Sequence, residues 1–345
     1  MTLIFAKGAP DFAAVADITL SSEASGSVPK ELVLPLHGGP ATYTLPSGAK
    51  LVGHSQKMTI FGRTLIQWAG SYIVALTVVR KIYELSNDGN AVVDVGETIK
   101  VLSLNESEKK SFSLTYFFMN EKSEMLHQYW ECRVGDHNGQ IILAQGSGVW
   151  DWFEDTKAGV EFDDLVARSV LHVATEAWTT RNYDFLYGGW FEIAFLNDDL
   201  QFEKLQYGLK FWHCNNDGSV KIDLPTVYSS YHGHDLVITS IFPQTNGSCH
   251  TFVNQIEDFV RRHAPELTSV PLWKPNHLFH IVSREKDKVV RIFCEMTDDQ
   301  SFWWEIGKDG PSKCNFKKQF IEMISQDGVG EYGKLDISKQ FLGDC

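Results

Sequence analysis

The sequence predicts an α+β protein in which helices lie outside two β-sheets. Short apolar segments typical of strands alternate with segments whose apolar residues recur every three to four positions, as in helices. The expected order is strands, one or two helices, strands, a long helix and strands again. At 345 residues the chain is long for one domain, so we expect either one large sandwich or one domain with an extension.

The first seventeen residues predict a β-hairpin. Two apolar runs, residues 3–7 and 12–17, flank a Gly-Ala-Pro-Asp segment typical of a turn, and the second run ends at Asp17. If Met1 is removed, Thr2 carries a free α-amine beside its hydroxyl. That amine, with a reference pKa of about 7.7–8.0, can act as the base for the hydroxyl. The alternative is an ordinary N-terminal strand.

Residues from about 23 to 53 predict a surface excursion. This stretch is rich in Ser, Gly and Pro, and it contains Gly38-Gly39-Pro40 and Pro46-Ser47-Gly48. Turns of this kind disfavour a regular helix.

The next segments change from strand to helix. Residues 57–61 and 64–70 predict two strands joined around Gly62. Residues 71–85 carry apolar side chains at helical spacing and predict a largely buried helix, which the Ser-Asn-Asp-Gly segment at 86–89 ends.

The middle of the chain predicts further strands. Residues 91–110 fit either a second helix or a pair of strands. Strands are expected at 111–119, 125–133 and 141–144, with a turn at 135–139 between the last two.

The clearest helix spans residues 162–180, where seven apolar residues share one face and acidic residues occupy the first turn. A strand at 190–196 and a hairpin partner at 202–212 follow. Beyond residue 213 we expect short strands at 236–242, 278–283, 288–295 and 301–306, with helices at 252–263 and 315–324.

Composition excludes several classes of protein. The formal net charge is −13 and no Lys/Arg-rich tract occurs, which argues against nucleic-acid and anionic-membrane binding. The N-terminus lacks the features of a signal peptide, and no uncharged apolar run is long enough to span a membrane, so a cytoplasmic location is expected. The six cysteines form no CxxC pair, which suits reduced thiols.

No cofactor or metal site is predicted. The chain contains neither a phosphate loop nor a dinucleotide fingerprint. His232-Gly233-His234-Asp235 is the best metal-like cluster, but spacing fixes no third ligand for it. A surface loop is the favoured interpretation of that segment.

Six short segments, in chain order, resemble the proteasome β-subunit family of N-terminal-nucleophile hydrolases. The resemblance covers roughly residues 2–212. Each motif alone is common, but their shared order is not. The segments are Thr2, Ala14-Val15-Ala16-Asp17, Lys57-Met58-Thr59-Ile60, Trp68-Ala69-Gly70-Ser71, Gly146-Ser147-Gly148, and Asp184 followed by Tyr187-Gly188-Gly189.

This resemblance implies a four-layer αββα sandwich over residues 1–212, in which residues 23–53 are an insertion. Residues 213–345 would form an α+β extension of unknown role. The family's activity implies a peptide or other amide substrate and assembly into a homo-oligomer, with no cofactor. Whether an ATPase partner exists is not evident from the sequence.

The resemblance also implies roles for individual residues. Thr2 would be the catalytic nucleophile, and Lys57 would place an ammonium next to it. Asp17 would support Lys57. The backbone N–H of Gly70 would help form the oxyanion hole.

Two further residues complete the catalytic set that the resemblance implies. The sequence also departs from the family's usual pattern in two places. Ser147 and Asp184 would hydrogen-bond around the amine. The insertion makes Lys50 and Lys30 rivals of Lys57, and Tyr187 stands where the family usually has serine.

Alternatives therefore stay open. Asp17 also fits a turn carboxylate, and Lys57 a solvated lysine at a strand edge. At the level of the whole protein, the chain fits a catalytically silent subunit that acts in assembly or partner binding, or an amidase of small molecules on the same fold. The presence of the threonine, the lysine and both aspartates favours the hydrolase.

Overall fold

The computed structural model describes part of the chain, in ranges separated by gaps. These residues are 3–9, 12–22, 26–33, 35, 40–42, 44, 48–137, 139–146, 190–215, 220–222, 226–232, 235–242, 247–253, 277–284, 290–296, 302–307 and 310–316. The described part is mostly sheet with few helices, which confirms the α+β class. None of its helices is long and apolar enough to cross a membrane.

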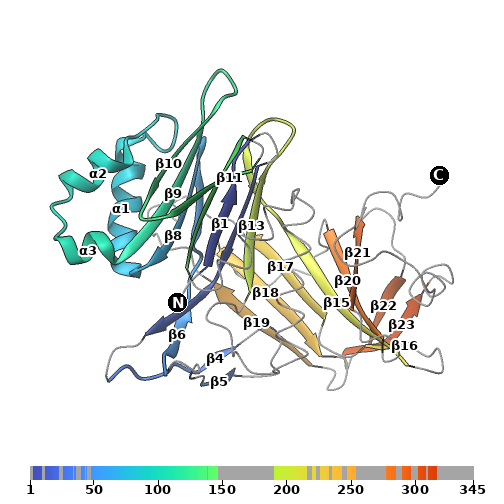
Figure 1. Cartoon of the computed structure of the whole chain (residues 1–345). Helices are drawn as coiled ribbons and strands as arrows, with labels where there is room; N and C mark the ends of the chain where they lie inside the picture. The colour runs from blue at the N-terminus through green and yellow to red at the C-terminus, as the bar shows by residue number, and fades with distance from the viewer. Residues whose placement is uncertain are drawn as a thin grey trace.

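Two antiparallel sheets form the centre of the N-terminal part (Figure 1). The first sheet has six strands in the order β11-β12-β1-β2-β13-β14, and the second has four in the order β10-β9-β8-β7. The strands of the first sheet are β1 (Leu3–Lys7), β2 (Ala13–Asp17), β11 (Arg133–His137), β12 (Gln140–Gly146), β13 (Phe191–Leu196) and β14 (Phe202–Lys204). Those of the second are β7 (Met58–Phe61), β8 (Thr64–Gly70), β9 (Phe112–Met119) and β10 (Met125–Trp130).

The two sheets pack face to face through one buried cluster of small and larger apolar side chains. Ala6, Ala14 and Ala16 of the first sheet belong to one buried cluster with Leu65 and Phe117 of the second. The short side chains let the sheets approach closely, and the larger ones fill the space between them.

Three helices cover the outer face of the second sheet (Figure 1). They are α1 (Tyr72–Leu85), α2 (Val95–Val101) and α3 (Glu106–Lys110). The segment that fitted either a helix or strands is therefore helical, and its caps explain why. Asp94 accepts a hydrogen bond from the Glu97 N–H, and Asn105 forms a capping box with Glu108.

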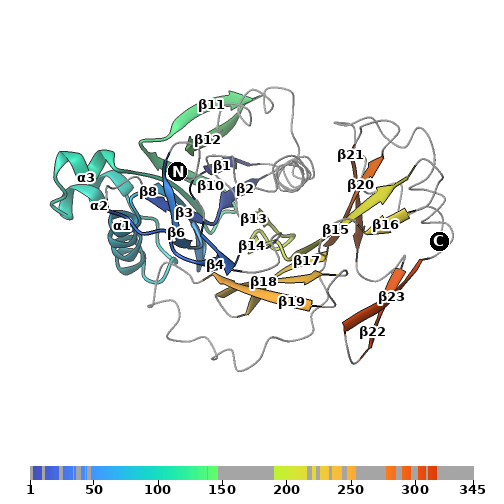
Figure 2. The same cartoon turned by 90° about the horizontal axis from the view of Figure 1, so that it is seen from below.

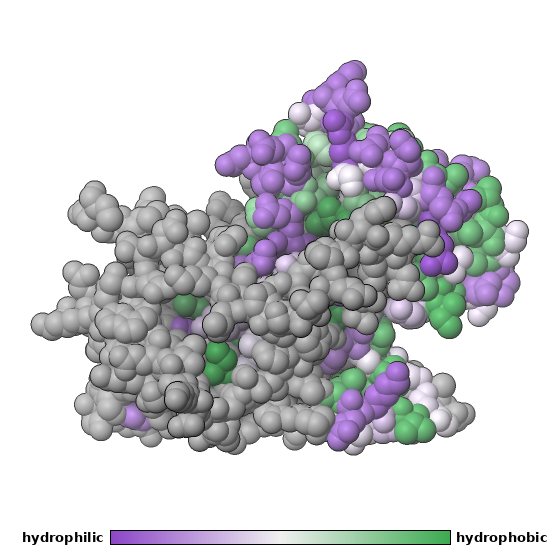
Figure 3. Space-filling view, turned by 180° about the vertical axis from the view of Figure 1, so that it is seen from behind, coloured by the Kyte–Doolittle hydropathy of each residue, from purple (hydrophilic) through white to green (hydrophobic). Residues whose placement is uncertain are grey.

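The exposed face of the helical side carries hydrophilic side chains with single hydrophobic ones between them (Figure 3). Ile73 and Val101 are the most exposed apolar side chains of the helices. Scattered residues of this kind are normal on a protein surface.

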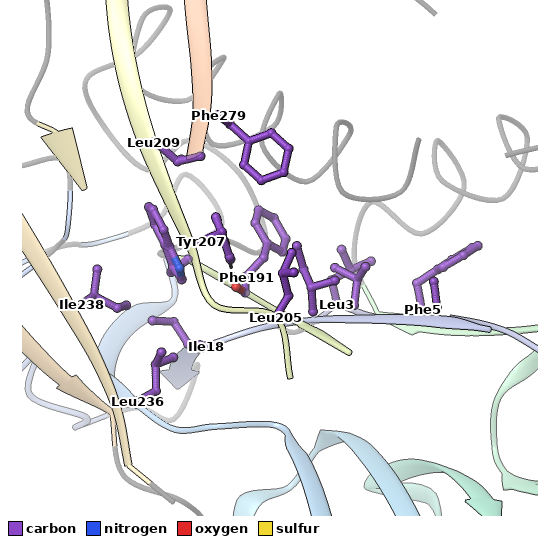
Figure 4. Packing of buried hydrophobic residues seen from close by; sticks show 14 of the residues in the cluster. Leu3, Phe5, Ile18, Phe191, Leu205, Tyr207, Leu209, Leu236, Ile238 and Phe279 are labelled. Carbon is purple, nitrogen blue, oxygen red and sulfur yellow. Dashed lines mark hydrogen bonds between the residues drawn. The ribbon is translucent and has the colours of Figure 1, made fainter. Parts of the chain in front are cut away.

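A third sheet packs against the outer face of the first sheet, on the side away from the helices (Figure 2). Its order is β19-β18-β17-β15-β20-β21, with β16 paired to β15. Leu3 and Phe5 of the first sheet lie in one cluster with Leu209 and Leu236 of the third (Figure 4). The strands are β15 (Tyr207–Cys214), β16 (Val220–Ile222), β17 (Thr226–His232), β18 (Asp235–Phe242), β19 (Gly247–Val253), β20 (His277–Arg284) and β21 (Val290–Met296).

Among the described residues, three small pairs of strands lie outside these sheets. β3 (Thr19–Ser22), just before the predicted insertion, pairs with β6 (Lys50–His54) at its end, and within the insertion β4 (Leu32–Val33) pairs with β5 (Pro40–Ala41). Towards the C-terminus, β22 (Phe302–Gly307) pairs with β23 (Gly310–Phe316).

The expected strand at 202–212 is wrong as a single element. β14 pairs with β13, whereas β15 lies in the third sheet beside β17 and parallel to β20. Residues 207–212 are buried without interruption, which suits a strand covered on both faces rather than a hairpin edge. The predicted domain boundary at residue 212 falls inside β15.

Several other expectations need correction, and one lies outside the described residues. The expected strand at 125–133 ends at Trp130, because Glu131 adopts a positive φ of 49° before β11 begins in the other sheet. The turn expected at 135–139 is shorter, since His137 pairs with Gln140. Residues 252–253 and 315–316 end strands rather than begin helices. The helix expected at 162–180 lies outside the described residues.

Candidate functional site

Asp17 ends β2 and is completely buried. Its Oδ1 atom accepts two hydrogen bonds, one from the Leu3 backbone N–H at 2.8 Å and one from Lys57 Nζ at 2.6 Å. The carboxylate therefore joins the first described residue of the chain to a lysine that is distant in sequence.

Lys57 directly precedes β7, and its side chain is also completely buried. Besides Asp17, its ammonium donates to the Thr19 carbonyl at 2.5 Å. A protonated lysine has three N–H donors, so one remains for an acceptor beyond these two described partners.

Burial lowers the pKa of Lys57, because the interior disfavours the charged ammonium. The negative charge of Asp17 and the hydrogen bond to it act in the opposite direction. Lys57 thus has a depressed pKa while it keeps a direct ionic partner, a combination common among groups that take part in proton transfer.

Gly70 ends β8 and leads into α1 through Ser71. Its φ is 88°, and a Cβ atom at this position would lie 2.3 Å from the Ser111 carbonyl oxygen, so only glycine fits. The Trp68 N–H donates to the Lys57 carbonyl at 3.0 Å. The end of β8 that carries Gly70 therefore lies beside the lysine.

Thr2, Ser147 and Asp184 lie outside the described residues, so their roles stay predictions. The described residues next to Thr2 and Ser147 nonetheless pair with each other between β1 and β12. Leu3, which follows Thr2 in the chain, pairs with Gly146, which precedes Ser147.

The rival lysines are elsewhere. Lys50 begins β6, and its Nζ donates to the Ser27 carbonyl at 2.5 Å. Lys30 is exposed. Of the three candidates, Lys57 is the one whose ammonium contacts Asp17.

Sequence reasoning missed a second buried ion pair beside the first. Glu192 of β13 is completely buried, and its Oε1 accepts from Lys204 Nζ at 2.6 Å. Its Oε2 accepts from the backbone N–H groups of Lys57 at 2.6 Å and Met58 at 3.2 Å. Burial raises the pKa of Glu192 and lowers that of Lys204, and their mutual attraction opposes both shifts.

One signal in the sequence could have pointed to this pair. Glu192 is the only charged residue in the apolar strand Phe191–Leu196, and a lone charge in a buried strand needs a partner. The sequence does not show which lysine supplies it.

The described residues offer no site for a metal. No group of three or more His, Cys, Asp or Glu side chains within them is placed to hold an ion. His232 and Asp235 pair at the end of the β17–β18 hairpin, and the two residues between them lie outside the described residues.

Comparison with known proteins gives little beyond this geometry. No family model matches the chain, and no curated protein matches it either. Among solved structures, the crystal structure of eukaryotic HslV from Trypanosoma brucei aligns with 55% of this chain and 97% of its own, at 14% identity and a TM-score of 0.31. Likeness at this level does not assign the chain to a family.

Proposed function

We propose that this chain is a threonine-type hydrolase that cleaves peptide or other amide bonds, with Thr2 as the nucleophile after removal of Met1. The observation that carries the proposal is the acceptor shared at Asp17. One oxygen of this buried carboxylate binds both the Lys57 ammonium and the N–H of Leu3, the residue that follows Thr2. A buried ammonium is thereby tied to the start of the chain.

The reaction would proceed by acyl transfer. The α-amine of Thr2 accepts the hydroxyl proton, and Oγ attacks the amide carbon to form a tetrahedral intermediate. The C–N bond then breaks, the leaving amine takes the proton, and an ester to Oγ remains. Water attacks that ester in a second step and restores the hydroxyl and the acid product.

The chain's own groups would favour each step. The Lys57 ammonium lowers the proton affinity of a nearby hydroxyl and amine, and its remaining N–H donor suits a third acceptor. The Gly70 N–H would stabilise the oxyanion, where one such donor contributes roughly 10²- to 10³-fold in rate. Ser147 and Asp184 would orient the amine and the attacking water.

The test is the intact mass of the purified protein before and after exposure to a β-lactone. We expect loss of the Met1 mass and one adduct that maps to Thr2. Thr2→Ala should form no adduct, whereas Thr2→Ser, which keeps a hydroxyl and an amine, should still react. Adduct formation in Thr2→Ala at the rate of the unmodified chain would refute the assignment of the nucleophile.

The alternative functions and the expected oligomer have separate tests. A free Thr2 that never reacts would favour a catalytically silent subunit that acts in assembly or partner binding. Hydrolysis of small amides but not of peptides would favour a small-molecule amidase. A homo-oligomer and a cytoplasmic location complete the proposal, and light scattering of the purified chain tests the first of these.

A further inference from the structure

Glu192 holds the backbone from which the Lys57 side chain begins. One of its oxygens, Oε2, accepts from two consecutive N–H groups, those of Lys57 and Met58. A carboxylate that receives backbone N–H bonds makes charge-assisted hydrogen bonds, which are stronger than neutral ones. The start of β7 is therefore fixed by a side chain that comes from the other sheet.

The other oxygen of Glu192 extends the network to the residue before Lys57. Lys204 Nζ bonds Glu192 Oε1 at 2.6 Å and Gln56 Oε1 at 2.7 Å. Residues 56, 57 and 58 are thus held at three consecutive positions by one connected set of groups.

This set also reaches the third sheet. Gln56 Nε2 donates to the Val253 carbonyl of β19 at 2.9 Å. Lys204 Nζ lies 4.9 Å from the centre of the Tyr231 ring of β17, within the range of a cation–π contact. The part of the chain beyond residue 213 therefore contacts Gln56, which precedes Lys57, and Lys204, which binds Gln56 and Glu192.

Stability alone is a weak reason for such a network. Two buried charges lose their hydration, and a buried ion pair often contributes no more than well-packed apolar residues would. Catalysis, in contrast, gains from exact placement, since a displacement of about 1 Å in a reacting group can lower a rate roughly 10²-fold.

We infer that Glu192 is a positioning residue for Lys57, and that it works together with Lys204, Gln56 and the third sheet. Its catalytic consequence rests on the proposed function, while its geometric consequence does not. Glu192 does not touch the reacting atoms. It sets where the Lys57 ammonium lies relative to Asp17 and the start of the chain.

The test compares Glu192→Gln with Tyr207→Phe in the full-length chain. Tyr207→Phe is the matched control, because its buried hydroxyl donates to the Phe191 carbonyl next to Glu192 but does not contact Lys57. Two quantities are measured: the rate of β-lactone adduct formation at Thr2 as a function of pH, and hydrogen exchange of the Lys57 and Met58 amides.

We expect Glu192→Gln to slow the adduct roughly 10- to 100-fold, to shift its pH profile and to raise exchange at both amides. Tyr207→Phe should leave the adduct rate, its pH profile and the amide exchange near the wild-type values. Equal effects of the two variants would overturn the inference, because they would show a general loss of stability. Wild-type rates and exchange in a folded Glu192→Gln would overturn it as well.

Two further results separate this inference from the proposed function. If Glu192→Gln does not fold, the double variant Glu192→Gln/Lys204→Met, which buries no unpaired charge, replaces it, with the same expected results and the same refuting ones. If the wild-type chain forms no adduct, the proposed function fails. Hydrogen exchange of the Lys57 and Met58 amides then tests by itself whether Glu192 positions the Lys57 backbone. Unchanged exchange would then refute the positioning role.

Discussion

The two buried ion pairs, Asp17–Lys57 and Glu192–Lys204, have the same N–O distance of 2.6 Å but different surroundings. Asp17–Lys57 lies at the start of the chain, and its ammonium keeps one donor beyond its described acceptors. The groups of Glu192–Lys204 are turned to the protein itself. The carboxylate of that pair binds two backbone N–H groups, and its ammonium binds a glutamine and faces an aromatic ring.

This difference indicates that the two pairs have different roles. A pair that binds the residue after Thr2 and keeps a donor beyond its described acceptors can act on a bound group. A pair whose described contacts go to the protein itself can hold its surroundings in place. Substitutions in the first pair should therefore have the larger effect on reactivity. Substitutions in the second pair should act on reactivity only through the placement of Lys57, beside their effect on stability.

The largest effect is expected from Lys57→Met. The variant keeps the apolar stem but leaves Asp17 without its cation, so adduct formation at Thr2 should fall about 10²- to 10⁴-fold. Loss of one partner from a fully buried pair should also lower the free energy of unfolding by about 3–5 kcal/mol. Adduct mass spectrometry and urea unfolding measure the two quantities.

Lys50→Met is the matched control for Lys57→Met. Its ammonium donates to the Ser27 carbonyl rather than to Asp17, and its side chain is not fully buried. We expect nearly unchanged reactivity in this variant. The opposite result, a reactive Lys57→Met and an inert Lys50→Met, would move the catalytic role to Lys50.

Lys204→Met should lower reactivity less than Lys57→Met does, because Lys204 acts on Lys57 only through Glu192 and Gln56. It leaves Glu192 buried without a cation, and we expect a loss of about 3 kcal/mol in the free energy of unfolding. The double variant Glu192→Gln/Lys204→Met should recover part of that loss, because neither remaining group is charged. Urea unfolding of both single variants and the double variant gives the coupling. Strictly additive losses would contradict a direct pair.

Elements that follow from local sequence patterns could be predicted, whereas the pairing of strands far apart in the sequence could not. The hairpin of β1 and β2 follows from two apolar runs around a turn, and α1 follows from its apolar spacing. The pattern predicts residues 202–212 as one hairpin partner of 190–196, but β15 lies in the third sheet, because a continuous apolar strand looks the same in sequence whichever strands it pairs with. The sequence of a strand does not specify which distant strand it pairs with.

The candidate site shows the same limit. Asp17 and Lys57 were identified through a resemblance, and spacing alone left Lys50 and Lys30 open. Glu192 was missed because its contact with the Lys57 backbone joins residues 135 positions apart. One charge in an apolar strand indicates that a partner exists, but only the folded chain shows which one.

A smaller effect is expected from Gly70→Ala, which tests the backbone beside the first pair. An L-residue at a φ of 88° is strained, and its Cβ would displace the Ser111 carbonyl that binds the Ser71 N–H. We expect a loss of about 2–3 kcal/mol and slower adduct formation. Gly96→Ala in α2 is the control, and it should gain up to about 1 kcal/mol. A loss in both variants would contradict this account.

The smallest effect, from Tyr207→Phe beside the second pair, depends on pH. At neutral pH the variant loses one buried hydrogen bond to Phe191, or about 0.5–1.5 kcal/mol. Burial, and to a lesser extent the charge of Glu192, raises the pKa of Tyr207 well above 10 in the folded state. As pH rises above 10, the unfolded chain releases that proton first, so the wild-type chain loses stability that the variant cannot lose. The gap measured by urea unfolding should therefore stay constant up to about pH 9 and close between about pH 10 and about pH 11. A gap that stays constant over the whole range would show that burial does not keep this hydroxyl protonated in the folded state.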